Sequence, residues 1–243
     1  MSNALEAYDE WHDRHEVDVS ADAPWHKTIR QRLRFETDIK DKKILEIGCG
    51  RGGFSCWLAT QNPKPERVFA ADFSPVAVEK GRQFSQQKGI DNIEWMVRDI
   101  ENLPDADSTY DTIFSYETIE HVPNPPKAVK EMARVLKPGG RMYLTTPNYM
   151  STIGLYRVYC WARGKKFDEG GQPICHVTML PKTRGWVKAA GLRIVESLST
   201  GQYLPFPGRP PIEMPWMDSL KPVCRWFGLH SAIIAEKPET HPK

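Results

Sequence analysis

Residues 44–53 read ILEIGCGRGG and place four glycines within six positions, directly after a short apolar run. An apolar run of this length that ends in glycine predicts a buried strand followed by a tight turn. Glycine permits such a turn, and it also lets a ligand approach backbone that carries no side chain. The stretch therefore predicts a ligand-binding turn between the first strand of a sheet and the helix that follows it.

Strand-like and helix-like segments alternate along the chain after this turn. Further strands are predicted at residues 67–72, 93–97, 110–116, 141–146, 192–198 and 230–236, with helices at 52–60, 75–88, 125–136 and 181–190. Ser74 can cap the second of these helices, and Pro75 suits its first turn. Strands that alternate with helices through short connections predict an α/β protein, whose mostly parallel sheet is covered by helices on both faces.

Three segments lie outside this alternation. Residues 1–40 are polar with scattered aromatic side chains, and we expect an N-terminal helical cap segment there, with a helix around residues 25–33. The main domain then spans residues 41–243. Two aromatic-rich stretches at about 147–180 and 200–228 show no regular pattern and are too long for ordinary loops. We interpret them as cap insertions that shape a substrate site.

The overall composition limits the partners of the protein. A formal net charge of +2 over 243 residues argues against a dedicated nucleic-acid binder, which needs a strongly basic face. The five cysteines, an odd number without a C-x-x-C pair, argue against a disulfide framework or a zinc site. No run approaches about 18 apolar residues, and the N-terminus has no apolar core. We therefore expect a cytoplasmic protein without a transmembrane helix, and the oligomeric state is not predicted.

The glycine turn fits two different ligand templates. Gly48, Gly50 and Gly53 match G-x-G-x-x-G, the dinucleotide fingerprint. Glu46 with Gly48, Gly50 and Gly52 matches acidic-x-G-x-G-x-G, the pattern of enzymes that use S-adenosylmethionine (SAM). A dinucleotide places its pyrophosphate on the helix N-terminus, where Glu46 would add unfavourable negative charge. SAM carries an ammonium and a sulfonium but no phosphate, so the acid favours SAM.

Five stretches along the chain carry a family resemblance. In order they read LEIGCGRGGFS, ADFSPVAVEKGR, RDIENLP, YDTIFSYETIEHV and VLKPGGRMYLTTPN. Together they resemble the class I SAM-dependent methyltransferases, over roughly residues 42–148 and more weakly over 176–199. One such motif is weak, whereas five in the expected order are strong. The resemblance implies a Rossmann-like methyltransferase fold, with a seven-stranded sheet in the order 3-2-1-4-5-7-6 and the seventh strand antiparallel.

The resemblance also implies which residues contact the cofactor. Asp72 matches the acid that binds the ribose, and Asp99 with Ile100 matches the pair around the adenine. Tyr116 ends the fourth strand, which opens beside the methionine part of the ligand. The full set of predicted cofactor-binding residues is Glu46, Gly48, Cys49, Gly50, Gly52, Asp72, Phe73, Asp99, Ile100 and Tyr116.

The segment ETIEH after the fourth strand holds the candidate catalytic residues. It lies at the carboxyl ends of the strands, where open α/β sheets bind ligands. Methyl transfer to a hydroxyl needs close positioning and also a base or a metal. His121 is the predicted base, with Glu120 beside it. The segment is also similar to one in the O-methyltransferases of ubiquinone biosynthesis, where the acids and the histidine serve a divalent metal. Two alternatives stay open: Glu117, Glu120 and His121 bind Mg²⁺, or Glu120 and His121 only shape the loop.

These observations predict an enzyme that methylates a small-molecule acceptor from SAM. The aromatic insertions favour a hydroxyl oxygen of an aromatic, quinol or lipid-like metabolite. The alternatives are methylation of a small amine, a nicotinamide-dependent dehydrogenase and a non-catalytic SAM-binding subunit. No Asn/Asp-Pro-Pro-Tyr motif occurs, which argues against methylation of amino groups in nucleic acid or protein.

One insertion also allows contact with a lipid surface. Residues 151–166 mix apolar side chains with Arg157, Arg163, Lys165 and Lys166. A stretch of this composition can lie on a membrane surface. Peripheral membrane contact is therefore an alternative to packing inside a cap.

Overall fold

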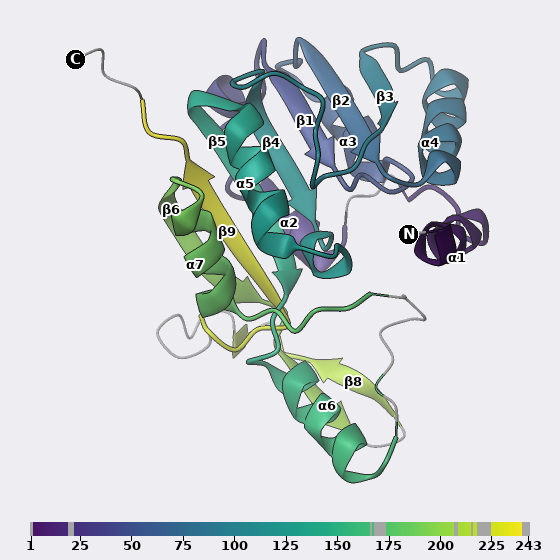
Figure 1. Ribbon diagram of the computed structural model, residues 1–243, viewed down its shortest axis with the longest axis vertical. Helices are drawn as coiled ribbons and strands as arrows, with labels where there is room; N and C mark the ends of the chain where they lie inside the picture. The colour runs from purple at the N-terminus through teal and green to yellow at the C-terminus, as the bar shows by residue number, and fades with distance from the viewer. Residues whose placement is uncertain are drawn as a thin grey trace.

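A seven-stranded sheet forms the centre of the molecule in the computed structural model (Figure 1). The structure describes residues 2–18, 22–165, 167, 174–206, 209–214, 216–217 and 225–239. The strands lie in the order β3 (Ile93–Val97), β2 (Arg67–Asp72), β1 (Lys43–Ile47), β4 (Tyr110–Tyr116), β5 (Leu136–Pro147), β9 (His230–Glu236) and β6 (Arg193–Thr200). Among these strands β9 runs in the direction opposite to all the others. The predicted order and the antiparallel seventh strand are confirmed.

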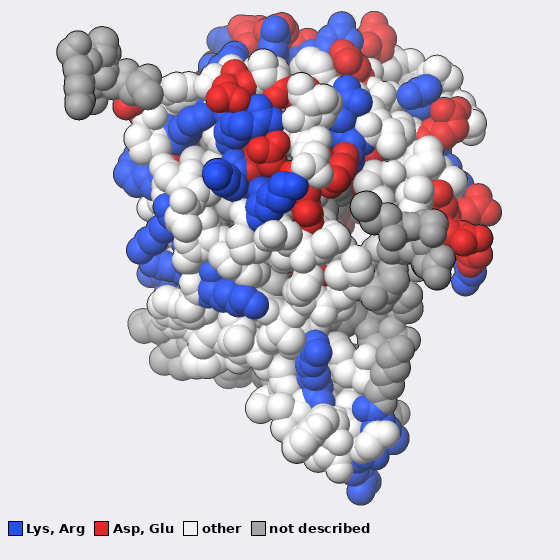
Figure 2. All heavy atoms as spheres, viewed as in Figure 1, with Lys and Arg blue, Asp and Glu red and all other residues white. Residues whose placement is uncertain are grey.

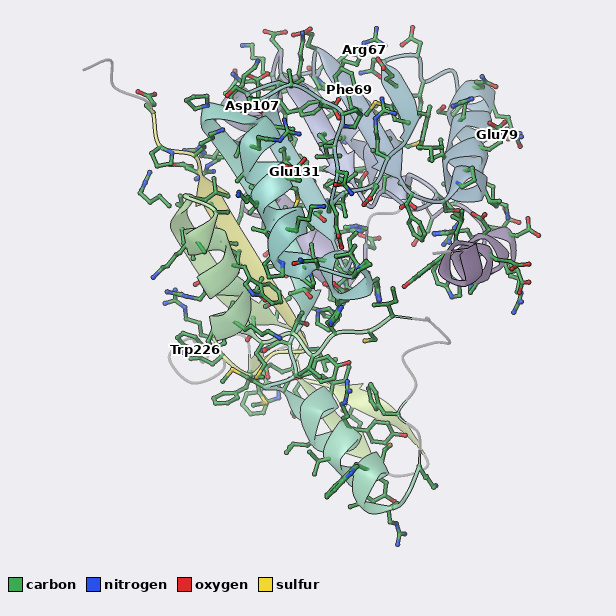
Figure 3. All side chains as sticks on the ribbon, in the orientation of Figure 1. Arg67, Phe69, Glu79, Asp107, Glu131 and Trp226 are labelled. Carbon is green, nitrogen blue, oxygen red and sulfur yellow. The ribbon has the colours of Figure 1, made fainter. Side chains whose placement is uncertain are left out.

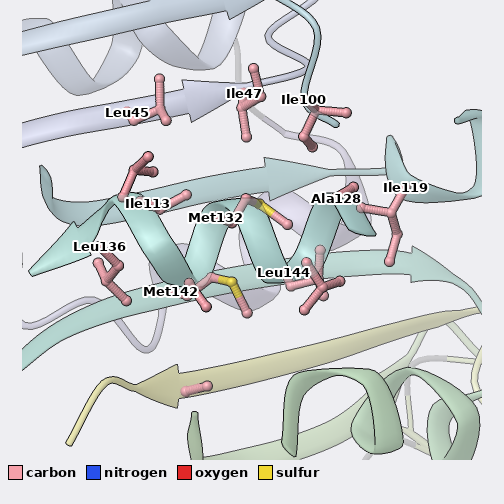
Figure 4. Packing of buried hydrophobic residues seen from close by; sticks show 14 of the residues in the cluster. Leu45, Ile47, Ile100, Ile113, Ile119, Ala128, Met132, Leu136, Met142 and Leu144 are labelled. Carbon is pink, nitrogen blue, oxygen red and sulfur yellow. The ribbon is translucent and has the colours of Figure 1, made fainter. Parts of the chain in front are cut away.

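Helices cover both faces of the sheet, as predicted. On one face lie α2 (Pro24–Arg30), α3 (Gly53–Ala59) and α4 (Pro75–Gln87), and on the other lie α5 (Pro125–Val135) and α7 (Leu180–Ala189). Ile29 and Leu58 join a buried cluster with Phe114 on the first face. On the second face Met132 of α5 packs on Ile113 and its neighbours in the sheet (Figure 4). Each face buries an apolar stripe of its helices, which supplies most of the driving force for this architecture.

Side-chain caps begin two of these helices. The Ser74 hydroxyl accepts a hydrogen bond from the Ala77 amide at 3.1 Å, and the Asn124 side chain accepts one from the Lys127 amide at 3.2 Å. Each cap is followed by proline in the first turn of its helix. Such caps satisfy backbone donors that have no partner inside the helix. The predicted Ser74 cap is confirmed.

Arg134 of α5 fastens the long connection between β3 and β4. Its guanidinium contacts Asp107 at 2.8 Å and Glu131 at 2.9 Å, both labelled in Figure 3. It also donates to the backbone carbonyls of Leu103 and Asp105. The carboxylates of Glu131 and Asp107 raise the pKa of Arg134, and its bonds to Leu103, Asp105 and Asp107 hold the connection against the helix.

The amino-terminal segment contains two further helices. These are α1 (Ser2–Asp13), which the sequence did not predict, and the π-helix η1 (Phe35–Ile39). Asp38 of η1 is buried at the amino end of the sheet, where it accepts hydrogen bonds from the Tyr143 hydroxyl and from the Arg34 amide. Arg141 lies 3.3 Å from the same carboxylate. This network ties the segment before β1 to the middle of the sheet.

A small lobe extends beyond the carboxyl ends of the parallel strands (Figure 1). It contains α6 (Thr152–Ala162) and a two-stranded sheet of β7 (Tyr203–Phe206) and β8 (Arg209–Glu213). The interpretation of residues 152–162 as irregular was wrong, because they form three helical turns that pack against β7. None of the helices in the described ranges has the length and apolar character needed to span a bilayer. The cytoplasmic location stays a prediction.

Candidate active site

The glycine turn after β1 is fastened to the neighbouring strands. The amides of Gly48 and Cys49 both donate to the Ala71 carbonyl of β2, at 2.8 and 3.0 Å. Gly48 has a φ of 74°, and a Cβ placed there would lie 2.2 Å from the Thr118 side chain. Glycine is therefore required at residue 48 both by its backbone conformation and by the close approach of the segment after β4. Cys49 is buried in the turn, and burial raises the pKa of its thiol well above the usual range.

Gly52 has a different reason to be glycine. A Cβ at residue 52 would lie 2.0 Å from the indole ring of Trp95, and a Cβ at Gly81 of α4 would lie 2.3 Å from the same ring. Trp95 of β3 fills the space between these two glycines, and its Nε1 donates to the Ser85 hydroxyl at 3.1 Å. The missing side chain at Gly52 thus serves packing between the turn and β3. At Gly50 an added Cβ would meet no close obstacle, because its nearest neighbour, the His12 ring, would lie 3.4 Å away.

Two buried carboxylates flank the turn. Glu46 of β1 and Asp72 of β2 are 3% and 5% exposed. Glu46 accepts a hydrogen bond from the Ser55 hydroxyl, and Asp72 accepts from the amides of Gly50 and Ser74 at 2.8 and 3.0 Å. Burial raises the pKa of Glu46 to about 8, and the charge of Asp72 adds to this effect. Burial also raises the pKa of Asp72. Two acids held close together in this way favour a cationic ligand beside them.

The side of the turn toward β3 exposes apolar surface next to an acid. Phe73 is 40% exposed although it directly follows Asp72. The Arg98 amide donates to the Asp72 carbonyl at 2.8 Å, which brings the end of β3 beside the end of β2. Asp99 there is exposed and accepts hydrogen bonds from the Glu101 amide and the Asn102 side chain, while Ile100 is buried. The structure therefore places all three predicted adenine-side residues along one edge.

Tyr116 closes the opposite side of the site. Its hydroxyl is buried without a hydrogen-bond partner in the described part of the chain. Burial, with the nearby charge of Glu46, raises its pKa well above the usual range. His26 of α2 packs edge-on against the Tyr116 ring at 4.9 Å, and burial lowers the pKa of His26 to about 4. Buried polar groups without partners are uncommon, and such a group at a ligand site is a candidate ligand contact.

Helix α1 covers the outer side of the glycine turn. Lys80 of α4 donates to the carbonyls of His12 and His15 at 3.2 and 3.3 Å, and also to that of Asp13. His12 is buried against Arg51 of the turn, with 3.1 Å between the Nδ1 atom and the guanidinium. Burial and the adjacent arginine lower the pKa of His12 to about 4, so its ring is neutral at pH 7. A neutral ring can pack over the turn without adding charge to the site.

Tyr8 links α1 to the segment after β4. Its ring packs edge-on against Phe73 at 5.0 Å and lies 6.2 Å from the His121 ring. The Tyr8 hydroxyl donates to the Ile174 carbonyl at 3.5 Å. The N-terminal helix thereby contacts both the glycine-turn side and the His121 side of the site.

Within ETIEH the structure brings Glu120 and His121 together. Glu120 is fully buried and accepts a hydrogen bond from the Thr146 hydroxyl at 3.0 Å. Its second oxygen lies 3.5 Å from Nε2 of His121. The other ring nitrogen, Nδ1, lies 2.7 Å from the Ile174 carbonyl, which can only accept, so we assign the proton to Nδ1. The Nδ1 bond to the Ile174 carbonyl thus orients the ring of His121, which ends the short helix η2 (Ile119–His121).

Glu117 has a separate partner. One of its oxygens lies 2.9 Å from Nδ1 of His230, and the other is buried without a partner among the described residues. Its φ of 46° is in the left-handed region, which is uncommon for a residue other than glycine. The three predicted Mg²⁺ ligands therefore do not converge, and no group of three His, Cys, Asp or Glu side chains with metal-binding geometry occurs in the described ranges. Mg²⁺ dependence stays a prediction without a described site.

Sequence reasoning missed three participants in this site. His12, Thr146 and His230 come from distant parts of the chain, and local spacing gives no sign of them. For His230 a signal existed, because the antiparallel seventh strand begins there and pairs with the end of β5 at Pro147. Strand order alone therefore places the first residue of β9 at the carboxyl edge of the sheet.

Comparisons with known proteins agree with this geometry. The family model described as "Methyltransferase domain" matches residues 38–178, more than half of the chain. The chain belongs to the methyltransferase domain family. Its fold is that of SAM-dependent methyltransferases, so the predicted family and fold are confirmed.

The similar proteins include two named O-methyltransferases. The chain is 27% identical over 222 residues to "Probable tocopherol O-methyltransferase, chloroplastic" of Oryza sativa subsp. japonica. The matched segment covers 85% of this chain but only 57% of that protein. It is 28% identical over 180 residues to a ubiquinone biosynthesis O-methyltransferase of Coxiella burnetii, covering 71% of this chain and 74% of the relative. Among solved structures, a chain from the complex of the Haloferax volcanii Trm112 methyltransferase activator with a methyltransferase superposes with a TM-score of 0.69. The two chains are 22% identical, and the superposition covers 99% of this chain and 100% of the other.

Proposed function

We propose that this protein transfers a methyl group from SAM to the hydroxyl oxygen of a small-molecule acceptor. The buried acidic pair beside the glycine turn is the observation that carries the proposal. Glu46 and Asp72 are held by a hydroxyl and by backbone amides rather than by a lysine or arginine. A ligand with a cationic end and ribose hydroxyls fits this pair, whereas a pyrophosphate does not. The names of the two relatives support oxygen as the acceptor atom.

The chain offers a complete set of groups to hold SAM. The backbone of Gly48 and Gly50 would contact its amino-acid part beside Glu46, and Asp72 would accept hydrogen bonds from its ribose. Phe73 and Ile100 would flank the adenine, with Asp99 at its edge. When bound, SAM supplies an electrophilic methyl group, and the Tyr116 hydroxyl is free to contact the ligand. We also infer that residues 1–40 and the two insertions act as caps over this site.

His121 is the proposed base for the acceptor hydroxyl. With the proton on Nδ1, the lone pair on Nε2 can take a proton, and the buried Glu120 would stabilise the resulting imidazolium. Glu117 with His230 is the rival base, because one Glu117 oxygen is buried without a partner in the described structure. Separate alanine variants of His121 and His230 distinguish the two.

The decisive experiment is calorimetric titration with S-adenosylhomocysteine and, separately, with NAD(H). Micromolar binding of the first and none of the second supports the proposal, and the reverse result contradicts it. A methyl-transfer screen of phenols, quinols, sugars and amines, with and without EDTA, then identifies the acceptor class. Turnover of amines alone favours an N-methyltransferase, and SAM binding without any turnover favours a non-catalytic subunit.

A further inference from the structure

The outward face of α6 is apolar, which reverses the usual pattern of a surface helix. Leu155, Val158 and Trp161 are 69%, 60% and 81% exposed, and Tyr159 is 43% exposed. Leu155, Val158, Tyr159 and Ala162 follow the i, i+3, i+4, i+7 spacing and therefore share one face. A helix on the surface of a globular protein normally turns its polar face outward. Exposed apolar patches of this kind mark interaction surfaces.

The inner side of the same helix is held firmly to the protein. Ser151 caps the helix through the Ile153 amide at 3.3 Å, and its hydroxyl donates to the Asn148 carbonyl at 2.6 Å. A Cβ at Gly154 would lie 1.9 Å from the Tyr149 carbonyl oxygen, so only glycine allows this close approach. The guanidinium of Arg157 lies 5.3 Å from the centre of the Tyr149 ring. The apolar face is therefore presented by a fixed helix.

Basic side chains accompany the apolar face. Arg163 and Lys165 directly follow α6, and no Asp or Glu occurs from Thr152 to Lys165. On the face drawn in Figure 2, the described part of the lobe shows Lys and Arg without Asp or Glu, whereas both kinds of charge occur on the main body. The Arg163 guanidinium also lies 5.7 Å from the Tyr159 ring.

We propose that α6 docks this protein on an anionic lipid bilayer. Leucine and valine side chains would enter the acyl boundary, tryptophan and tyrosine would lie at the headgroup level, and the basic groups would pair with lipid phosphates. Among the described residues of Thr152–Lys165, basic side chains occur without an acid, which is the charge pattern that such a surface requires. A second copy of this chain fits less well, because an 11-residue helix is only ~16 Å long. Such a helix presents far less than the roughly 1,000 Å² that a stable interface buries.

The docking site lies at the same edge of the molecule as the candidate active site. Strand β5 ends at Pro147, and α6 begins a few residues later. The lobe therefore follows the carboxyl ends of the parallel strands (Figure 1). A docked protein would therefore turn this edge toward the bilayer. Access to an acceptor dissolved in the membrane would follow, and this consequence alone rests on the proposed function.

Flotation of the full chain with vesicles tests the docking surface. We expect binding to phosphatidylcholine vesicles that contain phosphatidylglycerol, weakening with salt, and at least tenfold weaker binding to phosphatidylcholine alone. The variant L155E/V158E/W161E should lose at least tenfold in affinity. The variant R163E/K165E should lose about fivefold for each charge reversed, while keeping some salt-independent binding.

Matched controls separate docking from general surface effects. K130E on α5 reverses an exposed charge, and V195E on β6 places a charge at a valine that is 43% exposed. Both should bind vesicles like the unmodified chain. Far-UV circular dichroism and the melting temperature check that every variant is folded. Equal binding by L155E/V158E/W161E and the unmodified chain would overturn the proposal, as would no binding of the unmodified chain to anionic vesicles at low salt.

Two further readouts distinguish other occupants of the α6 face. Light scattering should give the same molecular mass for the unmodified chain and for L155E/V158E/W161E. A dimer that L155E/V158E/W161E abolishes would assign the face to a second copy and overturn lipid docking. Binding of S-adenosylhomocysteine to the same samples is measured separately, so failure of the proposed catalytic function would leave the vesicle result intact.

Discussion

Two buried carboxylates at opposite ends of the sheet have opposite surroundings. At the amino end, burial works to raise the pKa of Asp38, but hydrogen bonds from Tyr143 and Arg34, with the charge of Arg141, outweigh it and lower the pKa. At the carboxyl end, burial raises the pKa of Glu46 to about 8, and hydrogen bonds from Ser55 do not offset this effect. The protein completes the first site with its own groups, and we propose that a ligand completes the second. From this comparison we expect changes at the amino end to act on stability and changes at the carboxyl end to act on binding.

The largest expected effect comes from the carboxyl end. His121→Ala should lower kcat by roughly 100-fold or more, because general base catalysis contributes at least that factor. Binding of S-adenosylhomocysteine and the melting temperature should stay close to those of the unmodified protein. Steady-state kinetics with an acceptor from the screen measure the loss. His230→Ala is the matched comparison, and a larger loss for His230→Ala would transfer the role of base to the Glu117–His230 pair.

A change at the amino end should act on stability instead. Asp38→Ala leaves Arg141 with Glu236 as its carboxylate partner but removes the acceptor of the buried Tyr143 hydroxyl, and it should lower the free energy of unfolding by ~2 kcal/mol. Urea denaturation measures this loss, with Glu36→Ala on the exposed side of η1 as the control that should leave the midpoint unchanged. At temperatures where the variant is folded, its affinity for S-adenosylhomocysteine should be retained. A specific loss of that affinity would break the division between the two ends.

The contributions of Asp38 and Glu46 to stability should depend on pH in opposite directions. Because the folded-state pKa of Asp38 lies below its ordinary value of 3.8, its stabilising contribution is present above about pH 4 and is lost as the pH falls further. Glu46 has the opposite sign, since its pKa is raised from 4.5 to about 8. Its contribution is complete below about pH 4.5 and is lost as the pH rises toward 8. In the absence of ligand, melting temperatures from pH 5 to 9 should therefore fall less for Glu46→Gln than for the unmodified protein.

Glu46→Gln should also weaken ligand binding. Removing the acid that faces a cationic ligand group costs about 2 kcal/mol, or roughly 30-fold in affinity for S-adenosylhomocysteine. At pH 7 the unmodified protein should release a proton on binding, because the ligand's ammonium favours the charged form of Glu46. Calorimetry in buffers with different ionisation enthalpies measures this release. Proton release that persists in Glu46→Gln would assign it to another group.

The smallest expected effect concerns the cover over the turn. Lys80→Ala removes the side chain that binds three carbonyls at the end of α1. We expect S-adenosylhomocysteine affinity to fall by about threefold, and limited proteolysis before residue 18 to become faster, because α1 detaches more often. Glu79→Ala on the outer side of α4 (Figure 3) is the matched control and should change neither. Unchanged proteolysis in Lys80→Ala would show that other contacts are sufficient to hold α1.

The sequence predicted the sheet well because local patterns encode it. Apolar runs and caps such as Ser74 locate the strands and helices along the chain, whereas the order of the strands came from the family resemblance that the five motifs carry. Helix α6 was missed because apolar and aromatic side chains lie on both its inner and its outward side, so its sequence lacks the polar outward face that marks a surface helix. The Glu117–His230 contact and the position of α1 were also missed, because they join segments far apart in the chain. The cofactor-binding and catalytic residues remain predictions, although the structure brings most of them to one edge.

The slot between Gly52 and Gly81 makes three positions interdependent during evolution. Because the Trp95 indole occupies the space where both Cβ atoms would lie, neither glycine can gain a side chain while the tryptophan remains. A smaller residue at 95 would relax the steric constraint at 81. At 52 it would also remove the clash, but the φ of 72° would still favour glycine there. Homologues should therefore vary at these positions as a set, with larger residues at 81 only where residue 95 is small. Gly52, the last glycine of the acidic-x-G-x-G-x-G pattern, would then depend on the size of residue 95 as well as on cofactor binding.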